Sequence, residues 1–150
     1  MLSPHSLLRL RLFAAAAWWG SLSTLGFWVV PLLFKHLETP AMAGQMAARL
    51  FSAQTWVSVL CGVLLLLASR RDDQQKPQAP SVWVLGGLLL ALLIELGVQP
   101  RILARENLML WHNLGTLFYA LQWVCAGRVL WQCLPAHNSL AAQEKVDSAE

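Results

Sequence analysis

A chain of 150 residues is long enough for one domain. Hydrophobic residues make up 57% of it and charged residues only 13%, which excludes an ordinary soluble domain because so few charges could not cover so much apolar surface. The net charge of +3 does not indicate nucleic-acid binding, because the chain has no Lys/Arg cluster with interleaved aromatic residues. The composition therefore predicts a protein whose partner is the lipid bilayer.

Four long stretches contain no Asp, Glu, Lys or Arg, namely 12–34, 50–69, 77–94 and 107–127. A hydrocarbon core about 30 Å thick needs roughly 20 helical residues, and these stretches have about that length. Helices of a soluble bundle would keep a charged outer face, and these stretches have none. The prediction is an all-α integral membrane four-helix bundle, up-down-up-down, over 1–134, with spans at about 12–34, 50–69, 81–98 and 108–134.

The first predicted span carries Gly20, Thr24, Phe27 and Pro31 at helical spacing on one face. Small and hydroxyl residues let a neighbouring helix approach closely, so we expect this face to be used for helix packing. Pro31 lacks the amide proton that would bond the Phe27 carbonyl. We therefore expect a kink or a helix end near it.

A short polar link at 35–38 makes the first two spans antiparallel neighbours. Thr39 and Pro40 are typical of a helix start, a hydroxyl N-cap followed by proline at the first helical position. A helix of roughly 30 residues from this point would be about 45 Å long, which exceeds the bilayer core. Its first turns, 41–49, are therefore expected at or above the membrane interface.

A continuous stripe runs along the second span, and we expect it to pack against another helix. Its residues are Gly44, Ala48, Phe51, Thr55, Ser58 and Gly62. The rest of the chain consists of a proline-containing loop at 70–80, the third span, a link at 101–106, the fourth span and a polar tail at 135–150 that is typical of disorder. Four spans place both termini on one side. The distribution of Lys and Arg favours the cytoplasm for that side, and the inner membrane if the protein is bacterial.

Glu95 is the only carboxylate inside an apolar stretch, where a charge costs a few kcal/mol. His112 and Asn113 lie about one turn into the fourth span, and antiparallel packing should bring them to a depth similar to that of Glu95. Arg101 and Arg105 lie on the same side. Two interpretations stay open: a polar site that handles a proton, ion or metal, or a structural pair between Glu95 and a nearby cationic residue.

Other kinds of site are not indicated. Cys61, Cys125 and Cys133 show no Cys-x-x-Cys spacing, so neither a disulfide framework nor a zinc site is predicted. One histidine with one carboxylate falls short of the three or four ligands of a typical metal site. A bis-histidine haem would need His36, which lies at the edge of a span. No glycine-rich phosphate loop or nucleophile elbow is present, and we expect no metal, no cofactor and no enzymatic activity.

The junction of the first two spans resembles the signature of the transmembrane protein 205-like family, small four-span membrane proteins that include a bacterial domain of unknown function. The residues that match the pattern of this family are Phe27, Pro31, Leu33, Phe34, Leu37, Ala43, Gly44, Leu50 and Phe51. His112 with Gly115 matches a histidine and small residue near the start of the family's fourth helix. The resemblance implies a four-helix integral membrane domain and no settled molecular activity.

Two functions therefore stay open. The leading hypothesis is a non-enzymatic multipass protein that packs with other membrane components, either as a homo-oligomer or with another membrane protein, because the small-residue faces are packing features. The alternative is a subunit of a small transporter or channel that uses the Glu95/His112 layer. Four short helices rarely enclose a pathway alone, so the alternative also requires an oligomer.

Overall fold

The computed structural model describes residues 4–70 and 80–134, and every regular element in these ranges is helical. The first continuous helical rod consists of α1 (Pro4–Thr24), the π-helix η1 (Leu25–Val29) and α2 (Val30–His36). The second rod is α3 (Pro40–Arg70). The third consists of α4 (Pro80–Leu92), the π-helix η2 (Leu93–Val98) and α5 (Gln99–Leu103), and the fourth is α6 (Leu108–Cys133). The predicted tail at 135–150 lies outside the described residues.

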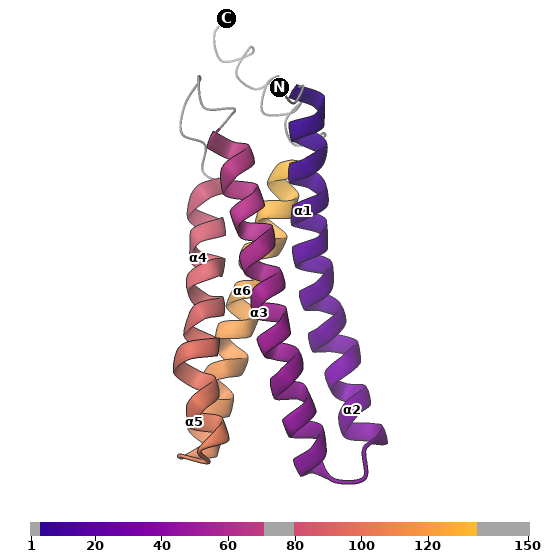
Figure 1. The fold of residues 1–150 in the computed structure, drawn as a ribbon, viewed down its shortest axis with the longest axis vertical. Coiled ribbons are helices and arrows are strands. Elements are labelled where there is room, and N and C mark those ends of the chain that lie inside the picture. The colour runs from indigo at the N-terminus through magenta and orange to yellow at the C-terminus, as the bar shows by residue number, and fades with distance from the viewer. Residues whose placement is uncertain (1–3, 71–79, 135–150) are drawn as a thin grey trace, which may run out of the picture.

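The rods lie side by side, and the two short links that join them lie at the same end of the molecule (Figure 1). One link follows α2 and the other follows α5, while the first turn of α1 and the last turn of α6 lie at the opposite end (Figure 1). α1 packs against α3 and α6, and α4 packs against α3 and α6. The described chain is thus built from two helical hairpins that pack against each other.

Three helices in the described ranges are long and apolar enough to cross a membrane: Ser6–His36, Pro40–Ser69 and Val82–Leu103. α6 covers the fourth predicted span as one helix of 26 residues, but it is not among the three. It carries the polar residues His112, Asn113, Gln122 and Arg128. The structure therefore supports three candidate spans, whereas the sequence pattern predicts four.

In the first and third rods, the π-helix ends two residues before a proline. In the first rod, the Val30 amide donates to the Leu25 carbonyl, five residues back, just before Pro31. In the third rod, the Gln99 amide donates to the Ile94 carbonyl, just before Pro100. Proline has no amide proton to donate. In the π-helical turn before it, the amide bonds the carbonyl five residues back instead of four. The helix that the sequence predicts to kink or end near Pro31 continues as α2 to His36.

The start of α3 confirms the helix-start prediction. α3 begins at Pro40, and the Thr39 hydroxyl oxygen accepts a hydrogen bond from the Met42 amide at 3.3 Å. This contact satisfies one of the amides that the first turn of a helix leaves without an intrahelical acceptor. The helix then runs to Arg70, so it is longer than the hydrocarbon core of a bilayer.

The buried core lies between α1, α3, α4 and α6. Its residues are Ala14, Ala15, Trp18 and Leu22 of α1, Cys61 and Leu65 of α3, Val84 of α4, and Ala126, Val129 and Cys133 of α6. Large side chains approach glycine backbones around this core. A Cβ atom added at Gly87 would lie 2.6 Å from Trp18 Cη2, and one added at Gly127 would lie 2.9 Å from Trp19 Nε1. Glycine therefore makes room for tryptophan at two helix contacts.

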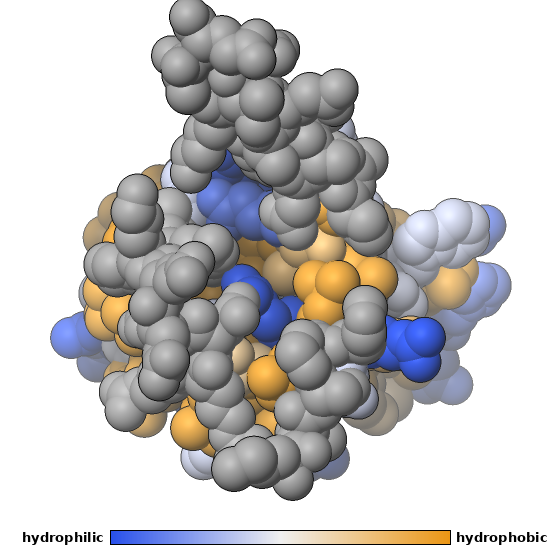
Figure 2. Space-filling model, turned by 90° about the horizontal axis from the view of Figure 1, so that it is seen from above, coloured by the Kyte–Doolittle hydropathy of each residue, from blue (hydrophilic) through white to orange (hydrophobic). Residues whose placement is uncertain are grey.

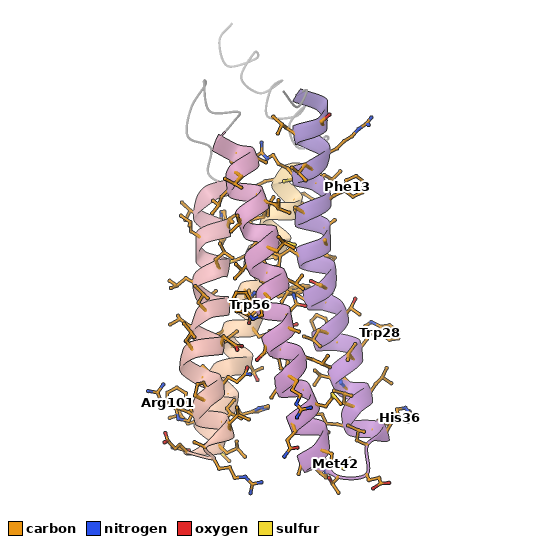
Figure 3. All side chains as sticks on the ribbon, in the orientation of Figure 1. Phe13, Trp28, His36, Met42, Trp56 and Arg101 are labelled. Carbon is orange, nitrogen blue, oxygen red and sulfur yellow. The ribbon has the colours of Figure 1, made fainter. Side chains whose placement is uncertain are left out.

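The outer surface of the rods is strongly apolar. Phe13, Trp28 and Trp56 are 72%, 71% and 70% exposed, and the side chains of Phe13 and Trp28 point away from the neighbouring rods (Figure 3). Seen from above, hydrophobic side chains also reach the periphery of the molecule (Figure 2). Large apolar side chains with this exposure on every rod fit a lipid environment and not an aqueous one.

Replacing Gly87 by alanine tests the contact between α4 and Trp18. Because Trp18 is fully buried, its ring cannot move freely away from a new Cβ atom at 2.6 Å. We expect Gly87→Ala to lower the free energy of unfolding by about 1–3 kcal/mol, measured by denaturation in detergent micelles. Gly20→Ala is the matched control, because its Cβ would meet nothing within 4 Å. Equal losses of stability in the two variants would contradict this packing.

Candidate functional site

Glu95 is the third residue of η2, and its carboxyl group faces α3. The Ser52 hydroxyl of α3 donates a hydrogen bond to Glu95 Oε1 at 3.0 Å. The side chain is half-buried, and Oε2 is shielded from solvent without a hydrogen-bond partner among the described residues. The single carboxylate of the apolar stretches therefore lies at a contact between two helical rods.

Gln99 lies one turn beyond Glu95 and extends the same contact. Its Nε2 donates to the Ser52 hydroxyl oxygen and to the Ala48 carbonyl, the latter at 3.3 Å. An amide nitrogen of this kind has two protons to donate, so both are directed at α3. Because Ser52 accepts from Gln99, its own proton is free for Glu95. The hydrogen-bond chain therefore runs in one direction, from Gln99 through Ser52 to Glu95.

The other residues of the predicted polar layer lie elsewhere. His112 and Asn113 of α6 are exposed. Arg101 donates to the Gly97 carbonyl at 2.9 Å, and its guanidinium lies 4.4 Å from the Trp111 ring centre (Figure 3). Arg105 is exposed in the link after α5, with a left-handed backbone φ of 56°.

No hydrogen bond or ion pair joins Glu95 to any of these four residues within the described ranges. The partner of Glu95 is a serine of α3 instead of an arginine or histidine. The sequence places Glu95 and His112 at a similar depth, but depth does not determine which side of each helix faces the other. Among the described residues, Glu95 and His112 therefore share no hydrogen bond or ion pair, and their combination in one layer stays a prediction.

The predicted packing face on the first rod points away from the neighbouring rods. Thr24, Phe27 and Pro31 are exposed, and a Cβ atom on Gly20 would meet nothing within 4 Å. Only Phe27 makes a ring contact inward, with Trp123 of α6 at 5.7 Å between ring centres. On this face, Thr24 is therefore exposed and the space beside Gly20 is open.

The packing residues predicted near the first link are divided between surface and interior. Phe34 is exposed, and a Cβ atom on Gly44 would meet nothing within 4 Å. Ala48 and Phe51 are half-buried. Phe51 packs edge-on against Tyr119 at 5.2 Å between ring centres, and Ala48 supplies the carbonyl that Gln99 bonds.

Sequence reasoning missed a set of uncharged polar residues that join the rods. Gln54 of α3 donates to Ser21 of α1 at 2.9 Å, and Gln122 of α6 donates to Ser58 of α3 at 3.0 Å. Both glutamines are buried. The sequence could have indicated these contacts, because a glutamine buried inside a charge-free stretch requires a hydrogen-bond partner.

Uncharged polar side chains also join α1 to α6. Trp123 donates its indole proton to the Ser23 hydroxyl at 2.8 Å, and the Tyr119 hydroxyl donates to the Leu22 carbonyl at 2.7 Å. Ser23 in turn donates to the Trp19 carbonyl at 2.8 Å. These contacts have no charged member, so they can persist in a medium of low dielectric constant.

The described residues form no group of three His, Cys, Asp or Glu side chains that could hold a metal ion. Cys61, Cys125 and Cys133 are free thiols. Glu95 is the one carboxyl group for which the described residues show a hydrogen bond between two rods.

Substitution of Gln99 tests the link between the third rod and α3. We expect Gln99→Met to lower the free energy of unfolding by about 1 kcal/mol, because two side-chain hydrogen bonds are lost in an apolar setting. Gln132→Met is the control, since the buried Oε1 of Gln132 has no partner among the described residues and an apolar replacement should be neutral or stabilising. The measurement is denaturation in micelles. A larger loss from the Gln132 variant would refute the assigned hydrogen bonds.

Residues 13–110 match the model of a family described as Domain of unknown function (DUF4149). The matched range extends from α1 to the first turn of α6. It does not confirm the resemblance to the transmembrane protein 205-like family. No curated protein and no solved structure matches the chain. Since the family model covers more than half of its length, the chain belongs to the DUF4149 family.

Proposed function

We propose that the protein is a four-span integral membrane protein that acts by associating with other membrane components. In this proposal α6 is the fourth span and the two hairpins form an up-down-up-down bundle. Both termini face the cytoplasm, across the inner membrane if the source is bacterial. The association uses the outward face of α1.

The position of α6 supports its assignment as a span. α6 packs against α1 and α4, which belong to two of the three candidate spans. Its buried Gln122 is paired with Ser58, and its exposed Leu117 and Val124 offer apolar side chains to the surroundings. A helix that lies alongside membrane spans at the same depth has the same solvent as its neighbours.

The outward face of α1 is the observation that carries the proposed association. Ala17, Gly20 and Thr24 follow one another at helical spacing, and Phe13 and Phe27 flank them. Ala17 and Thr24 are exposed, and a Cβ atom on Gly20 would meet nothing within 4 Å. In lipid, such small residues favour association because they let a second helix approach the backbone closely.

A transporter or channel built on a Glu95/His112 layer is the less favoured function. Glu95 bonds Ser52 of α3, whereas the His112 side chain is exposed on α6. A shared pathway would require both residues to line one space. The association proposal needs no such rearrangement.

Replacing Gly20 by leucine tests the proposed association. The Cβ atom of the new side chain would meet nothing within 4 Å, so the fold should be retained, but the leucine would block close approach of a second helix. We expect association in membranes to weaken roughly tenfold, equivalent to about 1.4 kcal/mol. The measurement is the crosslinked fraction of protein in native membranes, with differently tagged copies to separate self-association from association with another protein.

Gly97→Leu is the matched control, because a Cβ atom at Gly97 also meets nothing within 4 Å but lies on a different rod. It should leave the crosslinked fraction unchanged. A wild-type protein that is solitary in the membrane, or a Gly20 variant that associates as well as wild type, would refute the role of this face.

A further inference from the structure

The turn that joins α5 to α6, defined here as residues 101–111, lies at the end of the molecule that holds both links (Figure 1). Hydrogen bonds from three successive amides, of residues 104–106, to carbonyls of α5 fix its backbone, at 2.9–3.1 Å. Arg105 and Asn107 then adopt left-handed backbone conformations, with φ of 56° and 34°. The α5–α6 turn therefore presents its side chains from a defined backbone.

Arg101 is held in place by two contacts that leave its charge unpaired. Its Nη1 donates to the Gly97 carbonyl at 2.9 Å, and the guanidinium carbon lies 4.4 Å from the centre of the Trp111 ring. A guanidinium has five N–H donors, so most of them remain available. Among the described residues, neither Arg101 nor Arg105 is ion-paired with a carboxylate, although Glu106 lies in the same turn. The Arg101 side chain points away from α3 (Figure 3).

The side chains around these arginines are apolar. Four large ones are more than half exposed, namely Leu103, Leu108, Met109 and Leu110. A soluble anion would gain little from this surface. A phospholipid fits it better, because the phosphate can contact the arginines while the acyl chains contact the apolar side chains.

The neighbouring rods indicate the depth of the α5–α6 turn in a bilayer. Gln99 bonds the Ala48 carbonyl, so Arg49 of α3 lies at about the level of Arg101. Lys35 lies in the last turn of α2, at the same end. The charge-free stretches of the first two rods begin directly beyond Lys35 and Arg49. Cations at the edge of such stretches, with tryptophan beside them, are typical of the headgroup level.

We propose that the α5–α6 turn binds the headgroup phosphate of an anionic phospholipid. Arg101 donates to the phosphate oxygens, the Trp111 ring supports its guanidinium, and Arg105 supplies the second positive charge. The acyl chains lie over the exposed apolar side chains of the turn. An anionic lipid is favoured over a zwitterionic one because two arginines face a single carboxylate, Glu106. The inference rests on the proposed insertion in a bilayer, but not on association through α1.

Lipid titration tests this binding site. The full-length protein in neutral detergent micelles is titrated with phosphatidylglycerol or with phosphatidylcholine of the same acyl chains, and bound lipids are counted by native mass spectrometry. We expect phosphatidylglycerol to bind about tenfold more tightly. The preference should shrink at high salt because the attraction between charges is screened. Glycerophosphate, which lacks acyl chains, should not displace the lipid at equal concentration.

Charge-removing variants separate this site from general attraction to a cationic surface. Arg101→Gln should lower the affinity for phosphatidylglycerol about tenfold, and Arg105→Gln about fivefold. Arg101→Lys should restore only part of the loss, because it keeps the charge but not the planar set of donors. Lys35→Gln is the matched control: it removes one charge at the same end, from a side chain with no ring contact among the described residues. It should leave the affinity unchanged.

Three results would overturn the proposal. They are equal affinity for the two lipids, equal losses in the Lys35 and Arg101 variants, which would indicate general charge attraction, and displacement by glycerophosphate, which would indicate a site for free anions. Retention of the protein in vesicles after an alkaline wash is measured on the same preparations. Absence of lipid preference in a retained protein refutes the headgroup site alone. Release of the protein by the wash refutes membrane insertion and the headgroup site together.

Discussion

Polar groups in hydrocarbon must find their partners within the protein, and this constraint accounts for much of the structure. The described rods are joined by hydrogen bonds between uncharged side chains, such as Gln54 with Ser21 and Gln122 with Ser58. The same constraint applies to the backbone near Pro31 and Pro100, where a π-helical turn precedes each proline. Charge is confined largely to the links and ends, which leaves Glu95 as the exception.

The helices were predictable because lipid-facing helices must be long and free of charge. The start of α3 was predictable as well, since Thr39 and Pro40 supply a local cap whose effect does not depend on the rest of the fold. The π-helical turns were not, because sequence periodicity assumes 3.6 residues per turn throughout. α6 also departs from expectation: it is continuous over the predicted span, but it is not among the three candidate spans.

The candidate site was harder to predict than the helices. Sequence identifies Glu95 as unusual, but its partner Ser52 depends on how the third rod is rotated against α3, and no local pattern determines that rotation. The glycines illustrate the same limit. Spacing draws attention to Gly20, Gly44 and Gly62, and of these three only Gly62 makes, like Gly87, a close contact with a large side chain of another rod. Each of these contacts depends on a large side chain that lies far from the glycine in the sequence.

The central claim is that lipid surrounds the apolar outer surface of the rods, and solvent accessibility tests it most directly. Single cysteines would replace Trp56, which is exposed midway along α3, and Glu38 in the first link, after the three native cysteines are replaced by alanine. A water-soluble maleimide is then applied to open membrane fragments. We predict rapid labelling at position 38 and almost none at position 56 until detergent or denaturant is added. Equally rapid labelling at both positions in intact membrane would contradict the account.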